Sequence, residues 1–503
     1  MTGRGLHELL AVVALALGSA GCSSAVNALY GADAAADVAA ASVDAQAETG
    51  GGIAAPIQVC PSLPGAPAGV GPLPSSLQIA YQRTELTAFM HFGLNTFDGT
   101  EYGDSAKDAP SLFNPTNLDA SEWVNALKSA GFRQASLVAK HSTGFCLWPS
   151  AYTDYSVKNS PWKNGQGDVV KEFTDAMHAA GMRVGLWLSP WDQHYPSTSS
   201  DYETYLRNLV TELLTSYGPV YEIQFDGYQA PTSLDWKGIA QLAKQLQPDV
   251  LVWIGPEIAA TGADLRFLGN QSGQATRSTS SVADVPNGGP SNVWYPAEAP
   301  VSVCPPNWFW HPDNTVISLK SLQTIYFNTV GMNTTLALNV PPSTTGQFDT
   351  PETSLLQDFG TWYASLYKTN LIRGQPISAD STWENAGFDA AKVDDDDVCT
   401  YWAAASGKTS ARLEVTPSSA ITFKVISIRE PLELGERTTG YHVEIRQNGI
   451  WNKAPADASG NPIKGTLIGQ RQLWQLNSTM ADALALVIDS AKAAPAIAEF
   501  GVY

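Results

Sequence analysis

The sequence predicts an α/β protein, a (β/α)8-like barrel followed by a C-terminal antiparallel β-sandwich. Apolar strand-like runs alternate with helix-like runs from about residue 88 to residue 367, which is typical of a parallel barrel. Beyond residue 376 the helical spacing stops, and short apolar runs are separated by Gly, Asn and Pro, as in a sandwich. We therefore expect the barrel over 76–375 and the sandwich over 376–503.

The barrel segment contains eight strand-like runs, most of them followed by a helical run. The expected strands are residues 88–97, 135–140, 183–190, 220–226, 249–255, 264–270, 292–298 and 335–342. A near-continuous apolar run such as DVLVWIG (249–255) fits a buried parallel strand. The connection between the fifth and sixth strands is short for a full helix, so we expect an irregular barrel.

Residues 1–22 have the pattern of an export signal, with an apolar run after Arg4 that is too short to span a membrane. Small residues then precede Cys22, as at the cleavage site of a bacterial lipoprotein, where the cysteine becomes lipidated. We expect a cell-envelope lipoprotein, periplasmic or attached to the outer membrane, whose membrane contact is the lipid on Cys22. Because Ser19 stands where that motif usually has Leu, plain secretion is the alternative. Residues 23–75, rich in Ala, Gly, Ser and Pro, are expected to form a flexible tether.

The composition argues against several classes of partner. The chain of 503 residues has 29 Lys and Arg against 48 Asp and Glu, a formal charge of −19, so no nucleic-acid partner is expected. Its five cysteines lack the spacing of a zinc site, and no metal or other cofactor is expected. Cys60, Cys146, Cys304 and Cys399 are available for disulfide bonds, in a pairing that the sequence does not determine.

The stretch VYEIQFDGY (220–228) is typical of a short strand that ends in Asp226. Barrel enzymes carry their chemistry at the carboxyl ends of the strands, so we expect this carboxylate to line an active site. Other polar residues and three indoles follow the remaining strands: His91, Glu101, Lys140, His141, Asp192, Gln271, Glu298, Trp148, Trp191 and Trp294. Convergent polar groups between aromatic walls are typical of a sugar pocket.

Hydrolysis of a glycosidic bond usually needs two carboxyl groups. In a retaining enzyme one of them attacks the anomeric carbon, and the other protonates the leaving oxygen. We expect Asp226 to be the nucleophile. The acid should be a carboxyl group whose pKa is raised by an apolar setting or by the neighbouring carboxylate.

A series of motifs in the barrel segment occurs in the order typical of one enzyme family. They are HFGLNTF (91–97), FNP followed by EW (113–123), KHSTGFCLWPS (140–150), LSPWD (188–192), ELLTSYG to FDG (212–227), GADLRFLGN (262–270), WYPAE (294–298), NWFWHP (307–312) and LNVPPSTTGQF (338–348). They resemble glycoside hydrolase family 29, the α-L-fucosidases, and most closely the branch acting on α-1,3/1,4-linked fucose. The resemblance implies a retaining, metal-independent exo-hydrolase of fucosylated oligosaccharides or glycans. It places Asp226 at the nucleophile position and His91, Glu101 and His141 at sugar-contacting positions.

The chain departs from this family at several site positions. Ser142 and Thr143 stand where the family usually has His and Asp, and Gln224 replaces a tryptophan. Gln271 occupies the position of the acid/base glutamate, and an amide cannot donate a proton as a carboxylic acid does.

Three explanations of Gln271 are open. Glu298 or Glu257 supplies the proton from another loop, and Glu298, after the seventh expected strand, is the better candidate. Alternatively, the enzyme uses an unusual substrate or acceptor. The third explanation is a catalytically weak or inactive, fucosidase-like surface lipoprotein that binds glycans. We favour the hydrolase, because Asp226 and the polar rim are retained.

The C-terminal segment resembles the discoidin-like sandwich of the same enzymes. The matching stretches are FDAAKVDDDDVCTYWAA (388–404), REPLELGERTTGYHVEIRQNGIW (429–451) and PAIAEFGVY (495–503). The acidic run 394–397 offers oxygen ligands of the kind that calcium prefers. No full ligand set accompanies it, so a solvated acidic turn is the favoured interpretation.

Overall fold

The computed structural model describes residues 59–503, except 197, 227–233, 256–261 and 287–288. The expected export signal, Cys22 and Glu257 lie outside the described residues. The chain divides into two compact units, Met1–Gly51 and Gly52–Tyr503, and every described residue belongs to the second. Within the described ranges, no helix is both long and apolar enough to cross a membrane.

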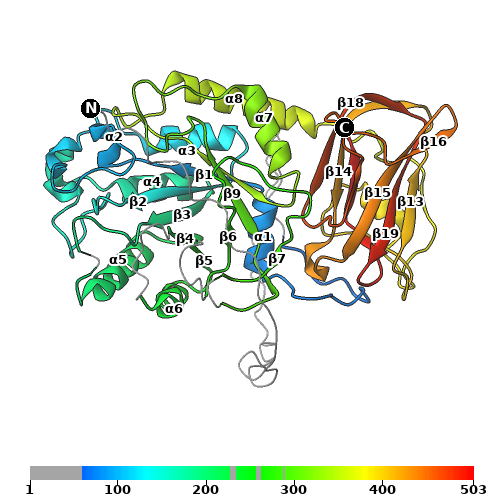
Figure 1. The fold of residues 1–503 in the computed structure, drawn as a ribbon, viewed down its shortest axis with the longest axis horizontal. Helices are drawn as coiled ribbons and strands as arrows, with labels where there is room; N and C mark the ends of the chain where they lie inside the picture. Colours follow the sequence, from blue (N-terminus) through cyan, green and yellow to red (C-terminus); the bar gives the residue numbers. More distant parts are fainter. Residues whose placement is uncertain (1–58, 197, 227–233, 256–261, 287–288) are drawn as a thin grey trace, which may run out of the picture. The chain divides into compact units, whose positions relative to one another are not determined.

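Eight parallel strands form the sheet of the expected barrel (Figure 1). In sheet order they are β5 (Leu251–Ile254), β4 (Glu222–Phe225), β3 (Arg183–Leu188), β2 (Gln134–Lys140), β1 (Leu86–Met90), β10 (Thr335–Asn339), β9 (Ala297–Ser302) and β6 (Arg266–Phe267). A parallel bridge between Trp253 and Leu265 connects β5 to the segment entering β6, so the two ends of the sheet meet. The predicted (β/α)8-like barrel is therefore confirmed.

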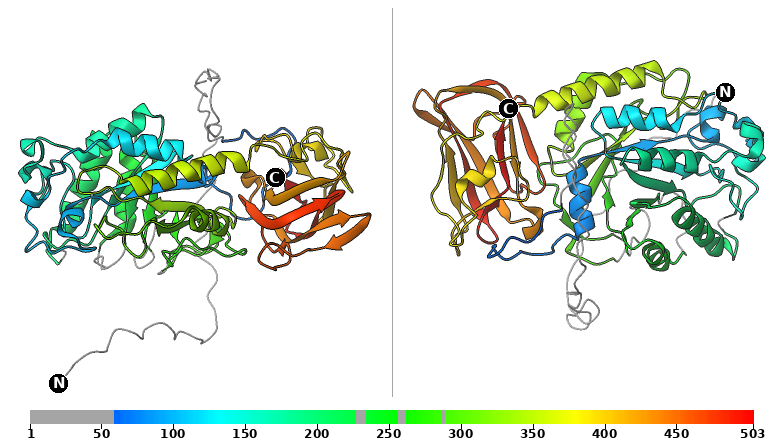
Figure 2. Two further views of the ribbon diagram at one scale, coloured as in Figure 1. Left: turned by 90° about the horizontal axis from the view of Figure 1, so that it is seen from above. Right: turned by 180° about the vertical axis from the view of Figure 1, so that it is seen from behind.

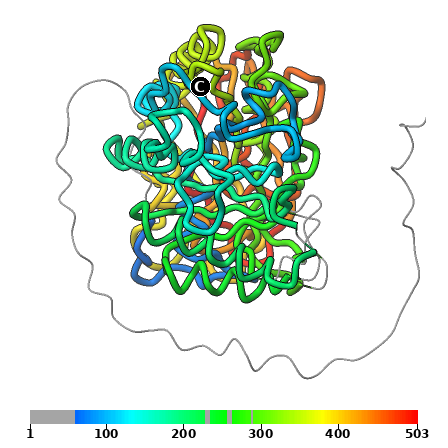
Figure 3. Tube along the Cα trace, turned by 90° about the vertical axis from the view of Figure 1, so that its left-hand side faces the viewer, coloured from blue at the N-terminus to red at the C-terminus, as the bar shows by residue number. Residues whose placement is uncertain are grey.

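Helices pack around this barrel, coloured from blue through cyan and green to yellow-green along the chain in Figures 2 and 3. They are α1 (Ser76–Thr84), α2 (Leu94–Asp98), α3 (Ala120–Ser129), α4 (Val169–Ala179), α5 (Tyr202–Ser216), α6 (Trp236–Leu246), α7 (Leu319–Asn328) and α8 (Thr350–Leu366). The Asp119 and Asp168 carboxylates begin α3 and α4 by accepting a backbone N–H. On α5, Leu206, Leu209 and Leu213 recur at helical spacing and are fully buried. Local capping and one apolar face thus fix where each helix begins and how it packs.

The seventh expected strand, 292–298, is wrong in position. Val293–Trp294 forms a short strand, β8, which pairs antiparallel with β7 (Val282–Ala283) in a separate sheet. The barrel strand β9 begins only after Pro296, whose nitrogen cannot donate to a ladder. Glu298 is therefore the second residue of its strand and lies toward the amino end of β9.

The C-terminal segment forms two main antiparallel sheets, as expected, and a small third sheet in which β12 (Trp402–Ala403) pairs antiparallel with β20 (Ala496–Ile497). The first contains β11 (Ile377–Ala379), β13 (Ala411–Val415), β19 (Ala483–Ala491), β15 (Thr438–Gln447), β16 (Ile450–Lys453) and β17 (Lys464–Gly465). The second contains β18 (Gln472–Ala481), β14 (Ile421–Arg429) and β21 (Glu499–Val502). Trp402 and Trp474 are buried in the hydrophobic core of this segment. The predicted β-sandwich is confirmed.

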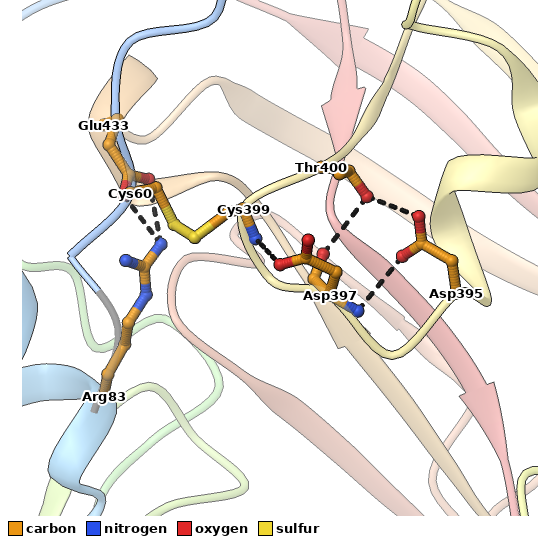
Figure 4. The surroundings of a disulfide bond; sticks show 7 residues. All are labelled: Cys60, Arg83, Asp395, Asp397, Cys399, Thr400 and Glu433. Atoms are coloured by element: carbon orange, nitrogen blue, oxygen red, sulfur yellow. Dashed lines mark hydrogen bonds and ion pairs between the residues drawn. A yellow bond between two sulfur atoms is a disulfide. The ribbon is translucent and has the colours of Figure 1, made fainter. Parts of the chain in front are cut away.

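A disulfide bond joins Cys60 to Cys399 of the sandwich, across a sequence separation of 339 residues (Figure 4). Beside it, Asp397 accepts a hydrogen bond from the Cys399 N–H (2.9 Å), and Asp395 accepts one from the Thr400 hydroxyl (2.6 Å). The acidic run thus shapes the loop that carries Cys399. In the part of the chain described, no group of three or more His, Cys, Asp or Glu side chains is placed to hold a metal ion.

Candidate active site

A cavity of about 120 Å³ extends from the carboxyl-terminal rim of the barrel into its interior. Six of the residues expected at the site line it: His91, Glu101, His141, Asp226, Gln271 and Glu298. The remaining lining residues are Phe89, Tyr102, Trp187, Trp253, Phe267, Pro300 and Trp308. The fold therefore brings together polar groups that lie up to about two hundred positions apart in the sequence.

Asp226 directly follows β4 and is partly exposed, whereas the strand before it is fully buried. Glu222, Gln224 and Asp226 occupy alternate positions, so their side chains share the face that looks into the barrel. The Gly255 N–H donates to the Phe225 carbonyl (2.8 Å), so the ladder between β4 and β5 continues to the residue before Asp226. Regular strand pairing thus positions the carboxylate at the cavity.

His91 is held in one tautomer. The Asn339 amide nitrogen donates to the Ser302 hydroxyl (3.1 Å) and to the Trp308 carbonyl (2.8 Å). The Asn339 oxygen therefore accepts from the His91 Nδ1–H, at 2.7 Å. Burial lowers the pKa of His91 to about 4, so the ring is neutral at physiological pH and its Nε2 atom is a hydrogen-bond acceptor.

His141 is fixed in the same way. The Ser142 hydroxyl donates to the Tyr102 carbonyl (3.1 Å), and so it accepts from the His141 Nδ1–H at 3.0 Å. The His141 ring stacks on Trp187, with centroids 5.4 Å apart. Burial, and then the nearby His91, lower the pKa of His141 well below its usual value. Ser142, one of the departures from the family pattern, thus leaves a second neutral histidine with an acceptor Nε2.

Glu101 shapes the loop that carries Trp308. Its Oε2 atom accepts from the Trp308 N–H (2.9 Å), while Oε1 lies 2.9 Å from the His311 Nε2 atom. Because the Trp308 ring is 5.2 Å from the His91 ring, this bond fixes an aromatic wall beside the histidine.

Two other residues expected at the rim, Lys140 and Asp192, are buried in the interior instead. Lys140 and Asp192 form an ion pair of 2.9 Å in which both side chains are fully buried. The other Asp192 oxygen accepts from the backbone N–H groups of His194 (2.9 Å) and Tyr195 (2.7 Å). A buried pair whose hydrogen bonds are satisfied in this way is structural.

The structure places the expected indole walls elsewhere. Trp148 is 2% exposed and donates to Glu212 (2.9 Å) in the barrel core. Trp294 is 5% exposed and donates to Gln82 (2.8 Å). Neither lines the cavity, and Trp191, whose ring is 6.3 Å from that of Tyr102, is not among the lining residues either.

The indoles of Trp187, Trp253 and Trp308 line the cavity instead. Trp187 and Trp253 lie inside strands, two positions before the rim residues Ser189 and Gly255. Side chains two apart on a strand share a face, so the sequence held a signal for these two residues. Trp308 belongs to the NWFWHP motif, which carries the family resemblance.

Glu298 lies deeper, in a buried polar cluster inside the barrel. Its Oε2 atom accepts a hydrogen bond from the Tyr81 hydroxyl of α1. Glu222 accepts from the amides of Gln134 (2.5 Å) and Gln224 (3.0 Å). Burial raises the pKa of Glu298 to about 7, and burial with the nearby Glu298 raises the pKa of Glu222 well above its usual value. Near neutral pH, Glu298 is therefore about half protonated.

Gln271 lines the cavity from the loop after β6. Its side chain is exposed, and its backbone has a φ of 47°, in the left-handed region that favours glycine. An amide at this position can donate or accept a hydrogen bond but cannot protonate a leaving group.

A barrel whose rim cavity joins a strand-end carboxylate to neutral histidines and indole faces is the architecture of a glycoside hydrolase. Comparisons with known proteins narrow this class. The family model for α-L-fucosidase matches residues 78–366. α-L-Fucosidase 1 of Arabidopsis thaliana is 36% identical over 458 residues, which cover 87% of this chain and 88% of the relative.

A relative in Oryza sativa subsp. japonica is also 36% identical, over 460 residues that cover 87% of this chain and 86% of its own. The structure of a Ruminococcus gnavus GH29 fucosidase in complex with fucose has a TM-score of 0.80 at 30% identity. That match covers 87% of this chain and 96% of the other. The chain therefore belongs to the α-L-fucosidase family, glycoside hydrolase family 29.

Proposed function

We propose that the protein is a retaining exo-α-L-fucosidase of fucosylated oligosaccharides, with Asp226 as the nucleophile. The observation that carries this proposal is the shared cavity, which Asp226 lines together with two neutral histidines and the indoles of Trp187 and Trp308. Its volume of about 120 Å³ is below the range of pockets for drug-sized ligands, which favours one terminal sugar over a longer glycan segment.

In the first step an Asp226 oxygen attacks the anomeric carbon, and the bond to the leaving oxygen breaks. The result is a fucosyl ester of Asp226, which water then displaces with overall retention of configuration. The Nε2 atoms of His91 and His141 accept hydrogen bonds from sugar hydroxyls, while the indole faces pack on the sugar's C–H groups.

Glu298 is the proposed proton donor. It lines the same cavity as Asp226, and its pKa of about 7 leaves a large protonated fraction at neutral pH. Tyr81 occupies its Oε2 atom, whereas Oε1 has no hydrogen-bond partner among the described residues. A proton on Oε1 is therefore the one that can be transferred toward the cavity.

A second candidate function is glycan binding with little turnover. Gln271 at the family's acid/base position favours it, and so does the depth of Glu298, whose side chain is fully buried. A binding protein would need only the histidines and indoles of the cavity, and its sugar affinity would not depend on a proton donor.

Two substrates separate these functions. An aryl α-L-fucoside has a good leaving group and needs little acid help, whereas a fucosylated trisaccharide needs a full proton transfer. The proposal predicts turnover of both by the purified chain, measured as released fucose. Binding of fucose without cleavage of either substrate would reject the hydrolase and leave the binding function.

We further propose that the chain is exported and lipidated at Cys22. The disulfide bond between Cys60 and Cys399 supports an oxidising compartment. Expression in a bacterium with a labelled fatty acid should label the wild type, and the Cys22→Ser variant should be unlabelled. Equal labelling of the wild type and the variant, or no labelling of the wild type, would reject lipidation at Cys22 and leave secretion without a lipid as the alternative.

A further inference from the structure

A second, larger cavity of about 1090 Å³ lies at the opposite ends of the barrel strands. It is lined by residues that precede or begin strands, among them Glu85 before β1, Arg133 before β2 and Arg183 at the start of β3. Residues of α8 and the sandwich residues Arg429 and Arg471 complete the wall. The proposed hydrolysis uses no part of this cavity.

The lining of this second cavity is basic, in contrast to the rest of the chain. Its cationic residues are Arg83, Lys128, Arg133, Arg183, Lys368, Arg429 and Arg471. Only Glu85 and Asp396 add carboxylates to the lining, although the whole chain has 48 Asp and Glu against 29 Lys and Arg. The charge of this lining is therefore opposite in sign to the formal charge of −19 of the whole chain. A recess lined by charge of one sign attracts ligands of the opposite charge.

Part of this positive charge is already neutralised. Arg429 and Arg471 both pair with Glu85, at 2.9 Å each, and also face Glu499. Arg83 pairs with Glu433 at 2.8 Å. Arg83, Arg429 and Arg471 are therefore paired with carboxylates.

Two cations on the barrel side, Lys128 and Arg183, donate to backbone carbonyl groups. The Lys128 ammonium donates to the Ala180 carbonyl (2.8 Å), and the Arg183 guanidinium donates to the Ala80 carbonyl (3.1 Å). Burial lowers the pKa of Arg183 and that of Arg133. The charge of Arg183 lowers the pKa of Arg133 further, whereas Tyr363 and Glu85 act in the opposite direction. Cations that repel one another in a partly buried recess would be stabilised by a bound anion.

Aromatic rings lie among these cations. Tyr363 and Tyr367 line the cavity, and the Arg471 guanidinium lies 4.6 Å from the centroid of the Tyr367 ring. Guanidinium groups match the geometry of carboxylates and sulfates, and aromatic faces pack on the C–H faces of sugars. The volume also exceeds that needed by a single small anion. We propose that this cavity binds an anionic glycan segment bearing uronate or sulfate groups, apart from the rim cavity.

Calorimetric titration of the full chain with a heparin-derived hexasaccharide, a sulfated uronate glycan, tests this site. Saturable binding that weakens as NaCl is raised is expected, despite the net negative charge of the protein. A neutral glucose hexasaccharide should give no heat. Absence of saturable binding by the wild type, or equal binding of the neutral glycan, would overturn the proposal. So would displacement of the hexasaccharide by inorganic phosphate at equal ionic strength, since the site would then hold small anions.

Charge variants locate the site. Replacing Lys128 and Lys368 with Gln should weaken hexasaccharide binding about five- to tenfold, since two charge contacts are lost. Replacing Lys408 and Lys424 with Gln removes the same charge from exposed sandwich positions and should leave the Kd unchanged. An equal loss of hexasaccharide affinity in both double variants would contradict binding in this cavity. Hydrolysis of an aryl fucoside by the Lys128/Lys368 variant should equal that of the wild type, so failure here is separable from failure of the hydrolase.

Discussion

Replacing Asp226 with alanine is expected to lower kcat for an aryl α-L-fucoside by at least about 10⁴-fold, because the covalent step loses its nucleophile. Fucose binding should persist, since the His91 and His141 contacts and the indole faces of the cavity remain. The measurement is steady-state release of the aryl group, together with a titration of fucose.

Two controls make the result on Asp226 specific. Asp358→Ala removes an exposed carboxylate from α8 and should leave kcat unchanged. Sodium azide added to the Asp226→Ala variant should restore turnover by attacking the anomeric carbon directly, and the product should be the β-fucosyl azide, inverted relative to the substrate. An Asp226→Ala chain that hydrolyses the aryl fucoside at the wild-type rate would exclude Asp226 as the nucleophile.

Replacing Glu298 with Gln is expected to lower kcat/KM for a fucosylated trisaccharide by about 10² to 10⁴-fold, the usual contribution of general acid catalysis. The aryl fucoside should lose much less, because its leaving group departs without a proton. Glutamine keeps the shape of the side chain, and its oxygen can still accept the bond from Tyr81.

The pH dependence gives Glu298 a signature of its own. In the proposed mechanism the protonated form of Glu298 is the active one. Because its pKa is raised to about 7, wild-type activity on the trisaccharide should be retained below pH 7 and lost as pH rises through 7. The Glu298→Gln variant should lack this alkaline limb. Gln271→Glu, which places a carboxyl at the family position, should raise trisaccharide activity. If the Glu298→Gln variant keeps both the wild-type rate on the trisaccharide and the loss of activity at alkaline pH, the proton comes from another group.

The sequence predicted the barrel well because its information was local. Apolar strand runs such as 249–255 and capped amphipathic helices such as α3 and α5 are defined within a few neighbouring residues. The seventh strand was placed wrongly because its apolar run continues across Pro296 from β8 into β9. Only the partner strands decide which half of such a run joins the barrel.

The polar residues of the site were easier to predict than its aromatic walls. His91, His141 and Asp226 follow strands, and the barrel rule brings such positions together without knowledge of any contact. Trp148 and Trp294 also lie near strand ends, but hydrogen bonds to distant partners draw them into the core. Those partners, 64 and 212 residues away, could not be identified from a single sequence.

The disulfide pairing also could not be predicted from the sequence. Four cysteines allow three full pairings, and the structure uses only one bond, between Cys60 and Cys399. Cys146 and Cys304 are buried free thiols in the barrel core. Their separation from each other follows from the packing of the barrel, which the sequence does not express locally.

The identity of the nucleophile can be read directly by mass spectrometry. Brief reaction with a 2-deoxy-2-fluoro-L-fucosyl fluoride should leave one fluorofucosyl group on the chain, and peptide mapping should find it on the side chain at position 226. A label on a different carboxylate, or steady hydrolysis of the reagent with no covalent adduct at any time, would contradict a double-displacement reaction at the rim of this barrel.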